Sequence, residues 1–387
     1  MVKYLWLIIL SPILLSACGS NDSIEDLSEP APLQKIEEEK EFDRLWGESI
    51  GDGQGELYNR IGPAIDQGNI YIASADGDVE AYTLEDGDDI WDVELDVELV
   101  GGVGVGEGLV VVGSVDGQLI ALDQQTGETR WQVQVKGEVL APAVIAKSYV
   151  FVQTLSGRLL ALNAEDGSEH WVYNSSVPVL TLRGTSTPVF DRDQILAGFA
   201  NGRVMAFDIE TGGINWDTRI SLAQGGTEIE RLSDIDGELL KSNAVVYAVS
   251  YQGQLTAISL DNGAMRWAEK ASSYVGMAEG FGNVYVVTDK GSVKAFDKNG
   301  QGMRWRQDEL RNRRLSGAVT LGSYVIVADF EGYMHALSQV DGRIIAREKV
   351  DGDGVQSRIL VKDQTLYIYG NSGKLAAYTL EDDAGWF

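Results

Sequence analysis

The chain has 387 residues, 44% of them hydrophobic, and only 7 prolines, which indicates a folded protein with a large core. Its 59 acidic and 31 basic residues give a formal net charge of −28. This excess excludes the basic footprint of a nucleic-acid binder and disfavours an anionic membrane surface as a partner. We interpret the charge as a well-solvated acidic surface.

The first residues have the features of a secretion signal. Lys3 is followed by the apolar run "YLWLIILSPILL", which is too short to span a bilayer. The run ends in "LSAC", which resembles the lipobox of bacterial lipoproteins; a chance cysteine near an ordinary cleavage site is the alternative. Cys18 is the only cysteine, so it has no disulfide partner within the chain. We expect residues 1–17 to be a lipoprotein signal peptide and Cys18 to be the acylated membrane anchor.

The residues after Cys18 indicate where the anchor goes and how the folded part is connected to it. Gly19 follows the cysteine, rather than the aspartate that favours inner-membrane retention, so the lipobox resemblance implies an outer-membrane lipoprotein facing the periplasm. The chain up to Arg44 is acidic and has little apolar periodicity. Residues 18–44 are therefore predicted to be the acylated cysteine and a flexible tether of about 85 Å at roughly 3.3 Å per residue. The folded domain is predicted to cover residues 45–387.

Eight stretches of the remaining chain align without gaps. One example is "SVDGQLIALDQQTGETRW", residues 114–131. Each stretch has a glycine followed four residues later by an alanine, and six of the eight have a tryptophan fourteen residues after the glycine. The glycines are Gly77, Gly117, Gly157, Gly202, Gly253, Gly291, Gly332 and Gly373.

Each repeat has the pattern of four short strands. An apolar run precedes a glycine turn, an alternating strand follows it, a second glycine turn leads into the tryptophan strand, and the connector has room for one more strand. Four strands in about 40 residues are typical of a propeller blade. The large indole fits between blades where the recurrent alanine leaves space. The sequence therefore predicts an all-β fold, an eight-bladed β-propeller of four-stranded antiparallel blades.

The ends of the repeat region indicate how the ring closes. Trp46 has the context of a tryptophan strand but no turn-and-alanine unit before it. We expect this N-terminal strand to complete the eighth blade and remove the exposed sheet edges. Completion by Trp386 or Phe387 is the alternative. Blade seven has Ala346 at its tryptophan position, which makes the packing there an open question.

The repeat also resembles that of eight-bladed quinoprotein dehydrogenases, which bind pyrroloquinoline quinone and calcium, so enzyme chemistry has to be considered. Adjacent cysteines are common near that cofactor, and this chain has only Cys18. Its two histidines, His170 and His335, occupy variable positions that we interpret as outward-facing, without partners at ligand spacing. No nucleophile elbow or phosphate loop occurs. We expect no enzyme activity, cofactor or metal; a quinoprotein-like periplasmic dehydrogenase is the alternative.

The two longest connectors between repeats are consecutive, residues 172–194 and 217–245. Connectors of this kind emerge on one face of a propeller, so we expect the two to lie side by side. In the first, Leu180, Leu182 and Arg183 combine apolar and guanidinium groups, a composition enriched at interface hot spots; burial of the leucines over the blade is the alternative. In the second, Asp234 and Asp236 form an acidic pair that could meet a basic partner or simply occupy a solvated turn.

The lipobox, the eight repeats and the insert motifs "LTLRG" and "GGTEIERLSDIDGE" together resemble the BamB family of lipoproteins. The resemblance covers the whole mature chain. It implies a non-enzymatic scaffold of the β-barrel assembly (BAM) complex that binds the POTRA domains of BamA and assists insertion of outer-membrane proteins. It places the partner-binding residues at Leu180, Leu182, Arg183, Asp234 and Asp236, with unfolded outer-membrane proteins as further candidate partners. A scaffold lipoprotein of another envelope complex would share the propeller but not these two inserts.

Overall fold

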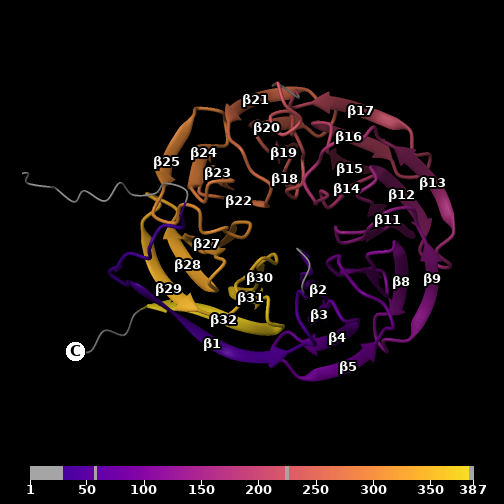
Figure 1. Ribbon diagram of the computed structural model, residues 1–387, viewed down its shortest axis with the longest axis horizontal. Coiled ribbons are helices and arrows are strands. Elements are labelled where there is room, and N and C mark those ends of the chain that lie inside the picture. The colour runs from indigo at the N-terminus through magenta and orange to yellow at the C-terminus, as the bar shows by residue number, and fades with distance from the viewer. Residues whose placement is uncertain (1–28, 56–58, 223–225, 383–387) are drawn as a thin grey trace, which may run out of the picture.

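The computed structural model of the protein describes residues 29–55, 59–222 and 226–382. Within these ranges the strands form eight four-stranded antiparallel sheets, arranged as blades around a central axis (Figure 1). The fold is therefore the eight-bladed β-propeller that the repeats predict. In the described part of the chain, no helix has the length and apolar character needed to cross a membrane.

Seven blades are built from consecutive strands, ordered from the axis to the rim. Blade one comprises β2 (Ala64–Asp66), β3 (Asn69–Ala73), β4 (Asp78–Thr83) and β5 (Asp89–Glu94). Blade two comprises β6 (Gly104–Gly106), β7 (Leu109–Gly113), β8 (Gln118–Asp123) and β9 (Thr129–Gln134). Blade three comprises β10 (Val144–Ala146), β11 (Tyr149–Gln153), β12 (Arg158–Asn163) and β13 (Glu169–Asn174). Blades four and five comprise β14 (Val189–Asp191), β15 (Gln194–Phe199), β16 (Arg203–Asp208), β17 (Ile214–Arg219); β18 (Leu240–Ser242), β19 (Val245–Val249), β20 (Gln254–Ser259) and β21 (Met265–Lys270). Blades six and seven comprise β22 (Met277–Gly280), β23 (Asn283–Val287), β24 (Val293–Asp297), β25 (Met303–Gln307); β26 (Val319–Leu321), β27 (Tyr324–Ala328), β28 (Tyr333–Ser338) and β29 (Ile344–Lys349).

Seven tryptophans join neighbouring blades in the same way. Each indole N–H donates to a main-chain carbonyl of the following blade; Trp91, for example, donates to Gln124 at 3.1 Å. The others are Trp46 to Leu84, Trp131 to Ala164, Trp171 to Ile209, Trp216 to Leu260, Trp267 to Lys298 and Trp305 to Gln339. The ring packs against the turn glycine of that blade: Gly127 has φ +72° and a Cβ there would lie 2.8 Å from the Trp91 ring. Both a left-handed backbone and a close approach therefore require glycine at this position.

Blade eight closes the ring with strands from both ends of the chain. It comprises β30 (Leu360–Lys362), β31 (Thr365–Tyr369), β32 (Lys374–Asp382) and, at its rim, β1 (Lys40–Ser49). β1 pairs antiparallel with β32, and Trp46 lies opposite Ala377. Closure by Trp46 is confirmed; Trp386 and Phe387, the alternative, lie outside the described residues.

The same closure explains the missing tryptophan of blade seven. In the other blades, the residue seven positions after the first glycine lies in a turn and accepts the indole N–H. In blade eight the equivalent residue is Leu380, which lies within β32 and pairs with Phe42 of β1, so that turn is absent. Ala346 is fully buried in the same core cluster as Phe42. A tryptophan at this seam would have no turn to receive it.

The folded domain begins earlier than predicted. We predicted a flexible tether up to residue 44, but β1 starts at Lys40 and residues 29–39 lie along blade seven (Figure 1). Main-chain hydrogen bonds link Ala31 to Arg311 and Glu39 to Ile345, each at 2.9 Å. Residues 1–28, which include the predicted signal peptide and Cys18, lie outside the described residues.

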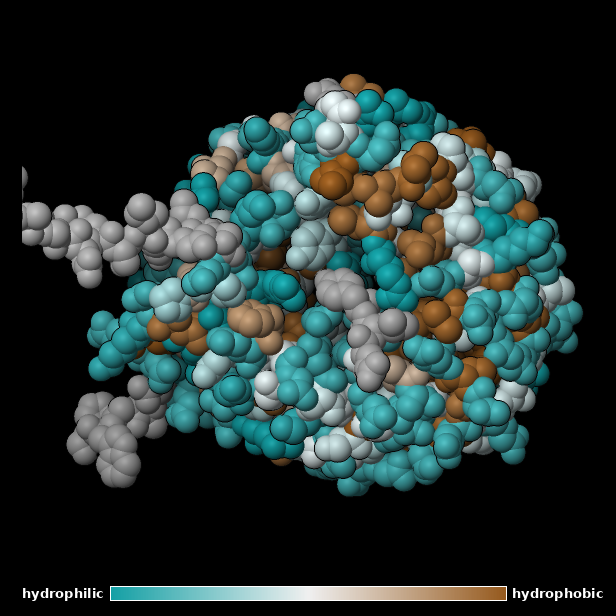
Figure 2. Space-filling model, in the orientation of Figure 1, coloured by the Kyte–Doolittle hydropathy of each residue, from teal (hydrophilic) through white to brown (hydrophobic). Residues whose placement is uncertain are grey.

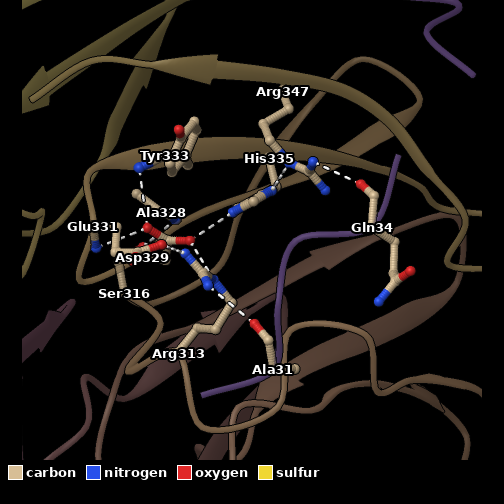
Figure 3. A network of polar contacts seen from close by, with 10 residues as sticks. All are labelled: Ala31, Gln34, Arg313, Ser316, Ala328, Asp329, Glu331, Tyr333, His335 and Arg347. Carbon is tan, nitrogen blue, oxygen red and sulfur yellow. Dashed lines mark hydrogen bonds and ion pairs between the residues drawn. The ribbon is translucent and has the colours of Figure 1, made fainter. Parts of the chain in front are cut away.

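Blade seven also contains a buried polar network (Figure 3). Asp329 and His335 are fully buried, with His335 Nε2 3.0 Å from Asp329 Oδ2, and Arg313 Nε donates to the same oxygen at 2.7 Å. The prediction that His335 faces outward is therefore wrong, because a buried carboxylate six residues earlier provides its partner. His170, by contrast, is exposed as predicted and stacks on Tyr149.

Candidate partner-binding surface

The two long connectors lie side by side, as predicted. The first runs from β13 to β14 and the second from β17 to β18. The main-chain N–H of Leu182 in the first connector donates to the Asp234 carboxylate in the second. The Asp234 carbonyl in turn accepts from the N–H of Tyr251, in the turn after β19, at 2.9 Å. Asp234 thus links the first connector through its carboxylate and the turn after β19 through its main-chain carbonyl.

The first connector presents apolar side chains to solvent. Val179 is 94% exposed and Leu180 is 41% exposed, whereas Leu182 is half-buried. Figure 2 shows apolar side chains gathered on the face of the ring that carries these connectors. The leucines therefore divide into an exposed one at the tip and a half-buried one that supports the loop.

Arg183 is held at the base of this loop. Its guanidinium, whose side chain is 30% exposed, lies 2.9 Å from a carboxylate oxygen of Glu138 in the connector between blades two and three. A second nitrogen donates to the Asn59 side chain at 3.3 Å. Arg183 thus ties the first connector to two other segments while its side chain stays partly exposed.

The two aspartates of the second connector are not on the surface. Asp234 is 0% exposed and Asp236 is 4% exposed, so the two do not lie in the solvated turn that the sequence analysis gave as the alternative to a partner-binding pair. Burial raises the pKa of Asp234 to about 6, and burial together with the neighbouring Asp234 raises the pKa of Asp236 to about 7. Gly184 lies directly against Asp236, where a Cβ would be 2.9 Å from the carboxyl carbon. The two aspartates therefore support the first connector, Asp234 through the hydrogen bond from Leu182 and Asp236 through its contact with Gly184.

The tip of the second connector adds exposed apolar groups that the sequence analysis did not single out. Thr227 and Glu230 form a capping box: the Thr227 hydroxyl accepts from the Glu230 N–H, and the Glu230 carboxylate accepts from the Thr227 N–H, both at 3.2 Å. This turn presents Ile229, which is 65% exposed, and Leu222 nearby in the chain is 57% exposed. Their presence in a loop otherwise rich in charged residues was the feature of the sequence that could have identified Leu222 and Ile229 as surface groups.

The central channel is a separate feature. It forms a cavity of about 850 Å³ lined by the inner strands and the connectors between them. Arg60 reaches across it to the Tyr274 carbonyl at 3.0 Å, and Arg358 pairs with Glu238 at 3.0 Å. Among the described residues no three histidine, cysteine, aspartate or glutamate side chains gather as a metal site would require.

Fold and surface together define an eight-bladed propeller that exposes apolar side chains on two clamped connectors. The family model described as "Outer membrane protein assembly factor BamB" matches residues 75–307 and 289–384. The chain belongs to this family of outer membrane protein assembly factors, which confirms the resemblance noted in the sequence. The protein is therefore an accessory assembly factor and not an enzyme.

Individual relatives agree with this assignment. The chain is 54% identical over 363 residues to the assembly factor BamB of Pseudomonas aeruginosa, covering 94% of this chain and 95% of the relative. It is 36% identical to that of Escherichia coli, covering 96% and 97%. The crystal structure of BamB from Moraxella catarrhalis superimposes with a TM-score of 0.81 at 30% identity, covering 87% of this chain and 99% of that one. A quinohemoprotein alcohol dehydrogenase from Comamonas testosteroni, with a TM-score of 0.70 at 15% identity, shares the fold alone.

Proposed function

We propose that this protein is a lipid-anchored scaffold of the BAM complex that binds the periplasmic POTRA domains of BamA through the surface formed by the two long connectors. In this role it assists the folding and insertion of outer-membrane proteins. The observation that carries the proposal is the exposed apolar tip around Leu180, held in place by the buried clamp between Asp234 and Leu182.

The physical properties of this surface suit protein binding. Val179, Leu180 and Ile229 expose apolar area on loops, and exposed apolar groups with a neighbouring arginine are typical of interface hot spots. The clamp holds the first connector in one conformation before binding, which lowers the ordering cost of association. Arg183, which pairs with Glu138 and keeps 30% of its side chain exposed, places a cation beside these apolar groups.

The membrane anchor is part of the same proposal. Cys18 would carry the acyl chains and hold the propeller at the outer membrane on the periplasmic side, as the "LSAC" motif suggests. Replacement of Cys18 by serine is expected to leave an unprocessed precursor without acyl label. Normal processing and lipid labelling of Cys18→Ser would contradict the anchor.

Capture of BamA by the purified variants tests the binding surface. Leu180→Asp is expected to weaken capture about 30-fold or more, because a charge would enter a desolvated apolar contact, a loss of about 2 kcal/mol. Arg183→Glu should weaken capture as well, since it removes the cation and places a second carboxylate beside that of Glu138. Val340→Asp is the matched control, because Val340 is 75% exposed but lies in a turn of blade seven.

The melting temperature of each variant separates binding from folding. Exposed loop substitutions usually change stability by only about 0.5 kcal/mol, so Leu180→Asp should melt as the parent does. A folded Leu180→Asp variant that captures BamA as well as Val340→Asp does would show that this surface is not the binding site.

A further inference from the structure

Residues 29–39, here called the strap, are fastened to blade seven by hydrogen bonds from groups distant in sequence. The Asn312 side chain donates to the Glu29 carbonyl at 3.2 Å. Two arginines reach the strap in the same way: Arg313 donates to the Ala31 carbonyl at 3.0 Å and Arg347 to the Gln34 carbonyl at 2.9 Å (Figure 3). Together with the main-chain bonds at Ala31 and Glu39, these contacts hold the strap along its whole length.

The strap is also packed against the core of the propeller. Ala31 is 8% exposed, and Leu33 and Ile36 lie against the hydrophobic cluster that contains Leu310 and Leu315. The side chain of Arg313 is only 3% exposed and simultaneously bonds Asp329. Detaching the strap would expose apolar area and leave a buried guanidinium N–H without its acceptor, which is costly. The strap is therefore a docked part of the fold rather than a tether.

We propose that the strap fixes the point at which the membrane anchor leaves the propeller. This inference rests on acylation of Cys18, part of the function proposed above. Ten residues, 19–28, separate Cys18 from Glu29, so at about 3.5 Å per residue the exit point lies within roughly 40 Å of the acylated residue. A flexible tether up to residue 44 would span about 85 Å and would restrain the propeller far less.

The fixed exit point gives the propeller an orientation. The first residues of the strap lie on the connector between β25 and β26. This connector joins two consecutive blades, as the two long connectors do, so it lies on the same face of the propeller as they do. The turn between β11 and β12 also belongs to this face, since Leu155 N–H donates to the carbonyl of Glu138 in a connector. The turn between β12 and β13, which contains Glu165, belongs to the opposite face. The partner-binding face is thus the one directed toward the membrane.

Trypsin tests the docking without any membrane. Lys35 is exposed within the strap, and the docked segment should be cleaved slowly there because a protease needs local unfolding. The double substitution Leu33→Asp and Ile36→Asp should speed cleavage about tenfold or more by opening the strap. The control is Glu37→Gln with Glu38→Gln, which alters exposed strap residues only. Equal cleavage of the parent and the Leu33→Asp, Ile36→Asp variant would overturn the docked strap.

Energy transfer to labelled lipid tests the orientation. The full acylated chain is reconstituted in phosphatidylcholine vesicles that contain a rhodamine lipid, with a donor dye on Lys290→Cys, on the connector face, or on Glu165→Cys, on the other. Because Cys18 is acylated, the introduced cysteine is the only thiol. Transfer should be greater from position 290, and the difference should shrink when Leu33→Asp and Ile36→Asp are added.

The outcomes separate the anchor from the strap. A chain that fails to float with the vesicles overturns the Cys18 anchor and with it the fixed exit point. Equal transfer from the two positions, in a chain that floats, overturns the orienting role of the strap alone. A difference that persists when the strap is opened would show that something other than the strap orients the propeller, and would overturn the proposal as well.

Discussion

Two buried aspartates in different regions of the propeller have opposite charge behaviour. Asp329 in blade seven and Asp234 in the second long connector are both 0% exposed. Asp329 lies between Arg313 and His335, and these partners, with the Tyr333 N–H, hold its pKa below the ordinary value despite burial. Within the described ranges the Asp234 carboxylate accepts from one main-chain donor, Leu182, and burial raises its pKa to about 6.

The difference shows that the supply of partners, and not burial alone, decides what a buried carboxylate does. In blade seven the charge is compensated, so the network fixes the strap and the blade as one unit. In the connectors Asp234 Oδ1 and Asp236 Oδ2 are buried without a hydrogen-bond partner among the described residues. Burial therefore favours the protonated forms of these two carboxyl groups, and we expect the stability of the connectors to depend on pH.

The largest expected effect comes from removing the compensated charge. Asp329→Ala leaves Arg313 and His335 buried without their acceptor and should lower the free energy of unfolding by about 3–5 kcal/mol. Denaturant unfolding measures the loss, and Asp166→Ala is the control because Asp166 lies in an exposed turn. If both variants unfold at the same denaturant concentration, the network contributes nothing and the contrast fails.

A smaller effect is expected at the clamp. Asp234→Ala removes the acceptor of the Leu182 N–H and should cost about 1–3 kcal/mol while weakening BamA capture, because the first connector loses its support. Asp234→Asn keeps an acceptor oxygen and should retain most of the capture. If the asparagine variant binds as poorly as the alanine variant, the charge itself meets the partner and the aspartate does more than support the loop.

The smallest effect is a difference in pH dependence. In the folded protein the pKa of Asp236 is about 7, against an ordinary value of 3.8. Protonated Asp236 therefore contributes to stability at low pH, and this contribution is lost as pH rises through about 7. Asp329 acts in the opposite direction, since its lowered pKa adds stability above its ordinary range that is lost on acidification. Asp236→Asn should therefore reduce the fall in melting temperature between pH 5 and pH 8. An unchanged fall would show that Asp236 does not titrate in this range.

The repeats allowed the propeller to be predicted because every repeat has its own turn glycine and alanine and six of the eight have the tryptophan, and Trp46, which has no repeat of its own, allowed the closure to be predicted. The side-by-side connectors were also predictable, since topology places them on one face. The burial of Asp234, Asp236 and His335 was not, because it depends on partners from other segments. The strap was missed for the same reason: its acidic sequence has no periodicity, and Arg313 and Arg347, which hold it, lie about 300 residues later.

The antiparallel pairing of β1 with β32 has a mechanical consequence. Lys40, at the start of β1, pairs with Asp382 at the end of β32, so force applied to the N-terminal side of β1 would peel the strands apart one residue pair at a time. This is the weak direction for pulling on a sheet, and β1 is the one strand that holds the ring closed. The hydrogen bonds and apolar contacts of residues 29–39 lie between any such load and Lys40. A force on the N-terminus would therefore have to break these contacts with blade seven before it reached the pairing of β1 with β32.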